Sequence, residues 1–171
     1  MANDHSSEEL EPRQPTVEDR RDWCHELNKR GAKFVVVGGF AMRAANFFRE
    51  TMDIDLVVAT DMENEANFFS ALSTLPDNAV RELQPGELQK HTVIRVGDEI
   101  VVDLMGLASG IDYAEALKDI IIRDVDGVPI PFASPRLLWR MKAKALWEKD
   151  ANDVRFFKHW FAERGETPPP V

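Results

Sequence analysis

Residues 34–58 read FVVVGGFAMRAANFFRETMDIDLVV. The apolar run at 34–37 is typical of a β-strand. The two glycines after it, Gly38 and Gly39, let the backbone turn sharply and approach a ligand without interference from Cβ atoms. A short helical segment runs on to Phe48, and a second apolar strand begins at Asp53. We therefore predict a strand, a glycine turn, a helix and a second strand within one block.

The second strand begins with two carboxylates, Asp53 and Asp55, which project from the same face because strand side chains alternate. At about 7 Å between their Cα atoms, they repel by roughly 2 kcal/mol at an effective dielectric of about 20. A bound cation would turn that repulsion into binding energy. Carboxylate oxygens favour Mg²⁺, which is usually shared with a substrate phosphate. The N–H groups that start the preceding helix would attract such a phosphate.

Each of these fragments also has an ordinary structural explanation. Two glycines are often only a turn, and an aspartate at either edge of a strand start is often only a solvated cap. The combination favours a binding site, because both fragments fall within one block of 25 residues.

The pattern Gly38-Gly39, thirteen residues, then Asp53-x-Asp55 resembles the signature of the DNA polymerase β-like nucleotidyltransferase superfamily. The resemblance covers roughly residues 33–157. It implies an α+β fold in which helices flank a mixed β-sheet, with a C-terminal helical segment. It also implies metal-dependent transfer of a nucleoside monophosphate from a nucleoside triphosphate to a hydroxyl.

Residues 49–55, RETMDID, look most like the small bacterial branch of that superfamily, which contains minimal nucleotidyltransferases and AbiEii-type toxins. The nucleotide-binding residues implied for this region are Gly38, Gly39, Arg49 and Thr51. Two positions depart from the pattern: many relatives have serine in place of the second glycine, and close relatives often have glycine in place of Asn46. Neither departure removes a metal ligand.

The superfamily uses a third carboxylate on a later strand, and Asp103 lies within the apolar run IVVDLM at 100–105. Such a run is typical of an interior strand, where an isolated carboxylate is costly unless it is paired or bound to a metal. A structural salt bridge would satisfy Asp103, but with Asp53 and Asp55 present we predict a metal ligand. The resemblance implies two Mg²⁺ ions, with Mn²⁺ as an alternative.

The chain has 171 residues, of which 44% are hydrophobic, and this predicts one domain with a substantial core. Its net charge of -9 is unfavourable for a protein that binds nucleic acid regardless of sequence. An apolar run of about 18 residues and a basic leader are both missing, so we expect no membrane contact. The single cysteine, Cys24, fits a reducing cytoplasm and core packing better than a metal site.

We expect a polar tail at 1–15, one domain at 16–164 with its core at 33–105, and a frayed tail at 165–171. Further elements follow from capping and turn patterns: helices at 16–30 and 60–75, hairpins at 91–104 and 120–130, and C-terminal helices at 134–164. Thr60 would cap the second helix, and Pro129 would place its strand at a sheet edge. The segment 77–89 lacks periodicity and would form either a loop over the site or a simple connection.

The helix expected after Ser134 is basic within an acidic protein. A solvated amphipathic face would explain this, and so would lysines that reach a triphosphate as point charges. The run from Lys142 to Lys149-Asp150-x-x-Asp153 resembles the lysine-bearing helix and the Lys-Asp-x-x-Asp element of AbiEii-like proteins. That resemblance implies a phosphate contact for Lys142 and a helper role for Asp150.

These patterns together predict a nucleotidyltransferase whose catalytic residues are Asp53, Asp55 and Asp103. Its acceptor would be a tRNA end, a protein side chain or a small molecule, and a cognate antitoxin would be a further partner. Two alternatives stay open: a catalytically silent nucleotide-binding or regulatory module of the same fold, and a metal-dependent phosphoesterase.

Overall fold

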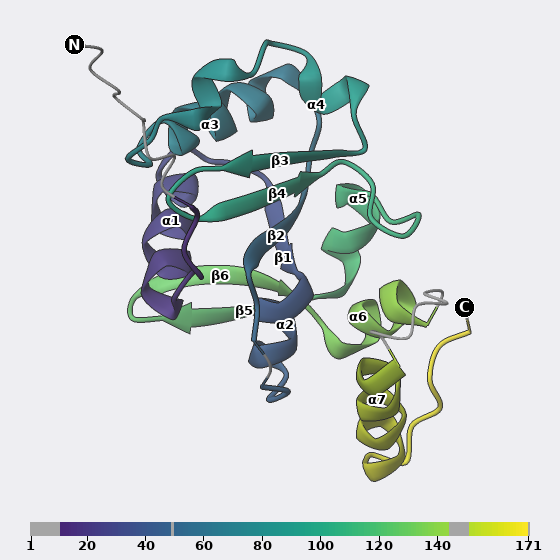
Figure 1. Cartoon of the computed structure of the whole chain (residues 1–171). Coiled ribbons are helices and arrows are strands. Elements are labelled where there is room, and N and C mark those ends of the chain that lie inside the picture. The colour runs from purple at the N-terminus through teal and green to yellow at the C-terminus, as the bar shows by residue number, and fades with distance from the viewer. Residues whose placement is uncertain (1–10, 49, 144–150, 171) are drawn as a thin grey trace, which may run out of the picture.

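The computed structural model describes residues 11–48, 50–143 and 151–170. Within these ranges the strands form one mixed sheet in the order β3-β4-β2-β1-β6-β5 (Figure 1). Its strands are β1 (Phe34–Val37), β2 (Asp53–Val58), β3 (Val93–Gly97), β4 (Val101–Met105), β5 (Ile120–Val125) and β6 (Val128–Ala133). β1 is antiparallel to β2 and parallel to β6, whereas β2 is parallel to β4. The hairpins β3–β4 and β5–β6 are antiparallel.

Helices flank this sheet, as the predicted fold class requires (Figure 1). They are α1 (Val17–Lys29), α2 (Gly38–Ala44), α3 (Met62–Leu72), α4 (Glu87–Lys90), α5 (Tyr113–Ala116), α6 (Pro135–Lys142) and α7 (Ala151–Glu163). α1 packs against α3 and β6, and α2 packs against β2 and α6. The mixed sheet with flanking helices confirms the α+β class predicted above.

The core lies where the apolar runs predict it. All four residues of β1 are buried, because this strand lies between β2 and β6 and is covered by helices. On α1, the capping box of Thr16 and Asp19 starts the helix, and the buried face includes Trp23, Cys24 and Leu27. Burial raises the pKa of the Cys24 thiol to about 12, which suits a core side chain.

Local predictions at Phe48, Thr60 and Pro129 were wrong. The helix after the glycine pair ends at Ala44 and does not run on to Phe48. The N-cap of α3 is Asp61, whose side chain accepts from the backbone N–H of Asn64, and not Thr60. Thr60 instead directs its methyl group toward the space that glycine leaves at Gly106. Pro129 does not mark an edge, since β6 lies between β1 and β5, and β5 is the edge strand. The proline is tolerated there because β1 pairs with β6 at Phe132, near the strand's other end.

The segment between α3 and β3 is held by two buried carboxylates. Asp98 accepts hydrogen bonds from the backbone N–H groups of Asp77 and Ala79, both at 2.9 Å. Glu65 accepts from the N–H groups of Gly86 at 2.6 Å and Leu88 at 2.9 Å. The prediction of a loop at 77–89 was wrong, because this stretch contains a 3-10 helix at Ala79–Glu82 and most of α4. The four bonds fix these short elements and give both buried acids a structural role.

The two tails contact the domain where the structure describes them. Arg13 pairs with Asp19 and Glu99, while residues 1–10 of the expected polar tail lie outside the described residues. In the tail expected to fray, Glu166 pairs with Arg136 and the carbonyl of Pro169 accepts from the Trp139 indole at 2.8 Å. In the described ranges, every helix is too short or too polar to cross a lipid bilayer.

Candidate active site

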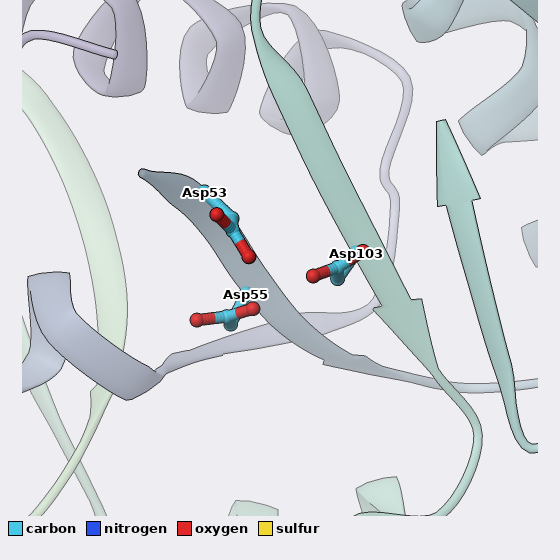
Figure 2. Close-up of side chains that lie close together, drawn as sticks. All are labelled: Asp53, Asp55 and Asp103. Atoms are coloured by element: carbon cyan, nitrogen blue, oxygen red, sulfur yellow. The ribbon is translucent and has the colours of Figure 1, made fainter. Parts of the chain in front are cut away.

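The three predicted aspartates come together on two neighbouring strands. Asp55 of β2 lies in register with Asp103 of β4, and Asp53 precedes Asp55 by two residues and therefore shares its face. One carboxylate oxygen from each side chain lies within 4.8 Å of the other two. Figure 2 shows the three side chains gathered on the same face of these strands. The clustering follows from strand alternation and from the parallel pairing of β2 with β4.

The electrostatics of this cluster favour a bound cation. Burial first, and then the charges of Asp103 and Asp53, together raise the pKa of Asp55 to about 7 against the lowering effect of Lys142. Burial also raises the pKa of Asp53, together with its hydrogen bond to Asp103, while the Arg95 charge acts in the opposite direction. Asp53 and Asp55 therefore ionise less easily than exposed acids do.

Arg95 supplies part of the missing charge. It lies on β3 directly opposite Asp103, and its Nε donates to Asp103 Oδ1 at 2.9 Å. Its Nη2 donates to both Asp103 Oδ2 at 2.8 Å and Asp53 Oδ2 at 2.7 Å. The bonds to Asp103 and its negative charge raise the pKa of the guanidinium above its usual value. Sequence reasoning missed Arg95, because the predicted two-residue turn at Gly97-Asp98 would place residue 95 opposite residue 100, whereas the observed register pairs it with Asp103.

The triad suits a divalent cation by its donor chemistry. Three carboxylates offer hard oxygen ligands from one face, as Mg²⁺ and Mn²⁺ prefer. A positively charged nitrogen of Arg95 already bridges two of them, so the geometry accommodates a cation shared between Asp53 and Asp103. The residues present therefore fit the metal ions that the sequence predicts.

The glycine pair makes room for the site's own side chains. Gly38 has φ +63°, and a Cβ atom there would lie 2.2 Å from Asp55 Oδ2. A Cβ atom on Gly39 would lie 2.6 Å from the Cβ of Thr51. The Thr51 hydroxyl donates to the backbone carbonyl of Asp53 at 3.0 Å and so fixes the chain where β2 begins. From the sequence, these glycines would let a ligand approach the backbone. In the structure, the space that their missing side chains leave is taken by the side chains of Asp55 and Thr51.

Lys142 lies at the end of α6 and is held by a carboxylate of the next helix. Its Nζ lies 3.1 Å from Asp153 Oδ2, and the Asp153 side chain is 1% exposed. The Lys142 charge acts on Asp55, so the lysine belongs to the electrostatic surroundings of the triad. Of the other predicted nucleotide-binding residues, Arg49 and Asp150 lie outside the described residues. Asp153, which the sequence motif contains, is thus the carboxylate seen beside Lys142.

Comparison with solved structures identifies this arrangement as a nucleotidyltransferase fold. A Thermotoga maritima protein assigned as a nucleotidyltransferase is 19% identical with a TM-score of 0.51, over 86% of this chain and 93% of that one. An antigenic nucleotidyltransferase-like protein from Paracoccidioides brasiliensis is 17% identical with a TM-score of 0.53, over 84% of this chain and 73% of that one.

A third similar structure is ANT(2'')-Ia in complex with adenylyl-2''-tobramycin. It is 19% identical with a TM-score of 0.54, over 83% of this chain and 87% of that one. No protein-family model matches the sequence, and no curated protein matches it. At these identities the shared feature is the fold.

Proposed function

We propose that the protein transfers a nucleoside monophosphate from a nucleoside triphosphate to a hydroxyl in a metal-dependent reaction. The observation that carries this proposal is the convergence of Asp53, Asp55 and Asp103 within 4.8 Å on a nucleotidyltransferase fold. A clustered acidic triad on strands is what a nucleotidyl-transfer site needs, because the substrate is a polyanion that must be held by cations.

In this proposal Asp53 and Asp55 would hold the Mg²⁺ that binds the triphosphate, and Asp103 would support the Mg²⁺ that activates the acceptor hydroxyl. Mg²⁺, or Mn²⁺ in its place, would neutralise phosphate charge and lower the pKa of the attacking hydroxyl. The acceptor oxygen forms a bond to the α-phosphorus as the bond to pyrophosphate breaks, and the hydroxyl proton passes to solvent. Gly38 orders the site by leaving room for the Asp55 carboxylate against the backbone.

The surrounding residues are proposed to hold the phosphates. The backbone N–H groups of Gly38 and Gly39 begin α2 beside Asp55, and the apolar Val37 before them provides no capping side chain. Lys142 would offset phosphate charge, since it already acts on Asp55. Arg49 and Asp150 keep the nucleotide-binding roles implied by the sequence resemblance, and Thr51 acts by fixing the start of β2.

The acceptor and the biological setting are proposed from the charge of the chain and from its resemblances. The net charge of -9 favours a small molecule or a protein over a tRNA end. The structure of ANT(2'')-Ia with adenylyl-2''-tobramycin provides one case of an adenylylated small molecule on this fold. The sequence resemblance to AbiEii-type toxins supports a cytoplasmic toxin–antitoxin system with ATP among the donors and a cognate antitoxin as partner.

A catalytically silent nucleotide-binding module is the second candidate. The observation that favours it is that Arg95 donates hydrogen bonds to both Asp53 and Asp103. A protein that binds no metal could neutralise its carboxylates in the same way. The two candidates differ in one product, because only transfer releases pyrophosphate.

The test is incubation of the purified protein with Mg²⁺, cell extract and each of the four nucleoside triphosphates, labelled on the α-phosphate. We expect label on RNA, protein or a small metabolite, and loss of that label in Asp55→Asn and in the double variant Asp53→Ala/Asp55→Ala. Asp77→Asn is the matched control, since Asp77 is exposed and lies outside the triad. Nucleotide binding without transfer would support the silent module, and unchanged transfer by Asp55→Asn would overturn the assignment.

A further inference from the structure

The guanidinium of Arg95 occupies the position between Asp53 and Asp103. One nitrogen, Nη2, lies 2.7 Å from Asp53 Oδ2 and 2.8 Å from Asp103 Oδ2, and Nε takes the other Asp103 oxygen at 2.9 Å. Both oxygens of Asp103 and one of Asp53 are therefore engaged by a single side chain. Those two carboxylates belong to the set whose oxygens converge within 4.8 Å.

Arg95 is placed so that it can leave without disturbing the core. It belongs to β3, the outer strand of the sheet beside β4, and its side chain is 63% exposed. In contrast, the Asp103 side chain is 9% exposed and stays within the sheet. A rotation of the arginine side chain alone would release Asp53, because the bonds involved are made only by the guanidinium tip.

We propose that Arg95 is a positioning residue that takes the place of the divalent cation in the metal-free protein and is displaced from Asp53 when the metal binds. This inference rests on the metal role proposed above for the triad. In the metal-free state the guanidinium holds the carboxylates together. During loading it competes with the incoming cation for the same oxygens and repels it at short range.

Nucleotide binding relieves this competition. A displaced guanidinium carries a planar fork of N–H donors that suits phosphate oxygens, and the triphosphate brings those oxygens to the triad. Metal and nucleotide therefore bind with positive coupling through Arg95, since each binds better when the arginine has left Asp53.

The test is Mn²⁺ binding, followed by electron paramagnetic resonance, in wild type, Arg95→Gln, Arg95→Lys and the control Arg123→Gln. Arg123 is an exposed arginine on the other outer strand, β5, so its variant changes the net charge equally. Without nucleotide, we expect Arg95→Gln to bind Mn²⁺ about tenfold more tightly than wild type, with Arg95→Lys between them and Arg123→Gln unchanged. A nonhydrolysable triphosphate should tighten Mn²⁺ binding more in wild type than in Arg95→Gln.

Unchanged or weaker Mn²⁺ binding by Arg95→Gln would overturn this inference and leave the proposed function standing. Equal tightening by Arg123→Gln would also overturn it, because the effect would then be general electrostatics. Absence of Mn²⁺ binding in every variant would overturn the metal role itself, and with it both proposals. Because the readout is metal affinity and not transfer, the two failures are distinguishable.

Discussion

Gly38 shows how a single absent side chain permits the site. Its φ of +63° is a conformation that residues with a Cβ atom rarely adopt. A Cβ atom built at this position would also lie 2.2 Å from Asp55 Oδ2, which is a steric clash. We expect Gly38→Ala to lower the free energy of unfolding by about 2–4 kcal/mol, from backbone strain and overpacking together. It should also weaken Mn²⁺ binding, because the Asp55 carboxylate must move. Urea unfolding and Mn²⁺ titration measure the two effects.

Gly31→Ala is the matched control. Gly31 has φ +66°, but its hypothetical Cβ atom meets nothing within 4 Å, so this variant carries the strain without the clash. We expect a loss of about 1–2 kcal/mol and unchanged Mn²⁺ affinity. Equal effects of the two variants on stability and on Mn²⁺ binding would contradict the role assigned to Gly38.

Asp55 gives the metal-free protein a specific dependence on pH. Its pKa is about 7 in the folded protein against an ordinary value of 3.8, so between these values the folded state holds a proton that the unfolded chain has lost. The stabilisation is complete below about pH 4 and is lost as the pH rises through 7. We expect the melting temperature of wild type, relative to Asp55→Asn, to fall over this range in the presence of a chelator.

The corresponding loss in the free energy of unfolding should be on the order of a few kcal/mol at the high-pH end. Thermal melts of wild type and Asp55→Asn at intervals between pH 4 and 8 provide the measurement. Parallel curves for the two proteins would show that Asp55 titrates as an ordinary exposed acid.

Among the elements, α6 and α7 are joined by an ion pair between Lys142 and Asp153 as well as by aromatic packing of Trp139 on Phe161. The Lys142 and Asp153 side chains are 16% and 1% exposed, so solvent screens their attraction only weakly. We expect Asp153→Ala to lower the free energy of unfolding by about 3 kcal/mol and to reduce transfer, because the lysine loses its support. Urea unfolding and the labelling assay measure these effects.

The exposed pair of Lys118 with Glu115 is the control, since the Lys118 side chain is 72% exposed. Lys118→Ala should change the free energy of unfolding by less than about 1 kcal/mol. A loss in the free energy of unfolding for Asp153→Ala that is as small as the loss for Lys118→Ala would contradict the contribution assigned to the ion pair.

The strands and the acidic residues were predictable from sequence for a common reason. Buried strands require continuous apolar runs, so β1, β2 and β4 are visible in the sequence, and an acid within such a run is conspicuous, as Asp103 is. The pairing of β2 with β4 was not predictable, because the two strands lie far apart in the chain. The contacts of Arg95 were not predictable because they depend on the register of the β3–β4 hairpin. The contact of Lys142 with Asp153 was not predictable because it depends on how α6 and α7 pack together.

At the scale of the whole molecule, ligands should stabilise the domain. A ligand that binds only the folded state at about 100 times its dissociation constant adds about 2.7 kcal/mol. Because metal binding requires an ionised Asp55, we expect Mg²⁺ with a triphosphate to raise the melting temperature by several degrees at pH 8 and less at pH 5.5.

Differential scanning fluorimetry at both pH values tests this expectation, with Asp53→Ala/Asp55→Ala as the control. The variant should show no rise at either pH. A rise of equal size in the variant would place the ligand somewhere other than the triad.

The order in which the site's residues occur along the chain has a consequence for protein synthesis. Asp53 and Asp55 leave the ribosome first, Asp103 follows, and Lys142 and Asp153 emerge last. The central strand β2 cannot acquire its neighbour β4 until the middle of the chain has been translated. A nascent polypeptide therefore cannot bring Asp103 beside Asp53 and Asp55 until β4 has left the ribosome, so the acidic cluster assembles well after its first two members have been synthesised.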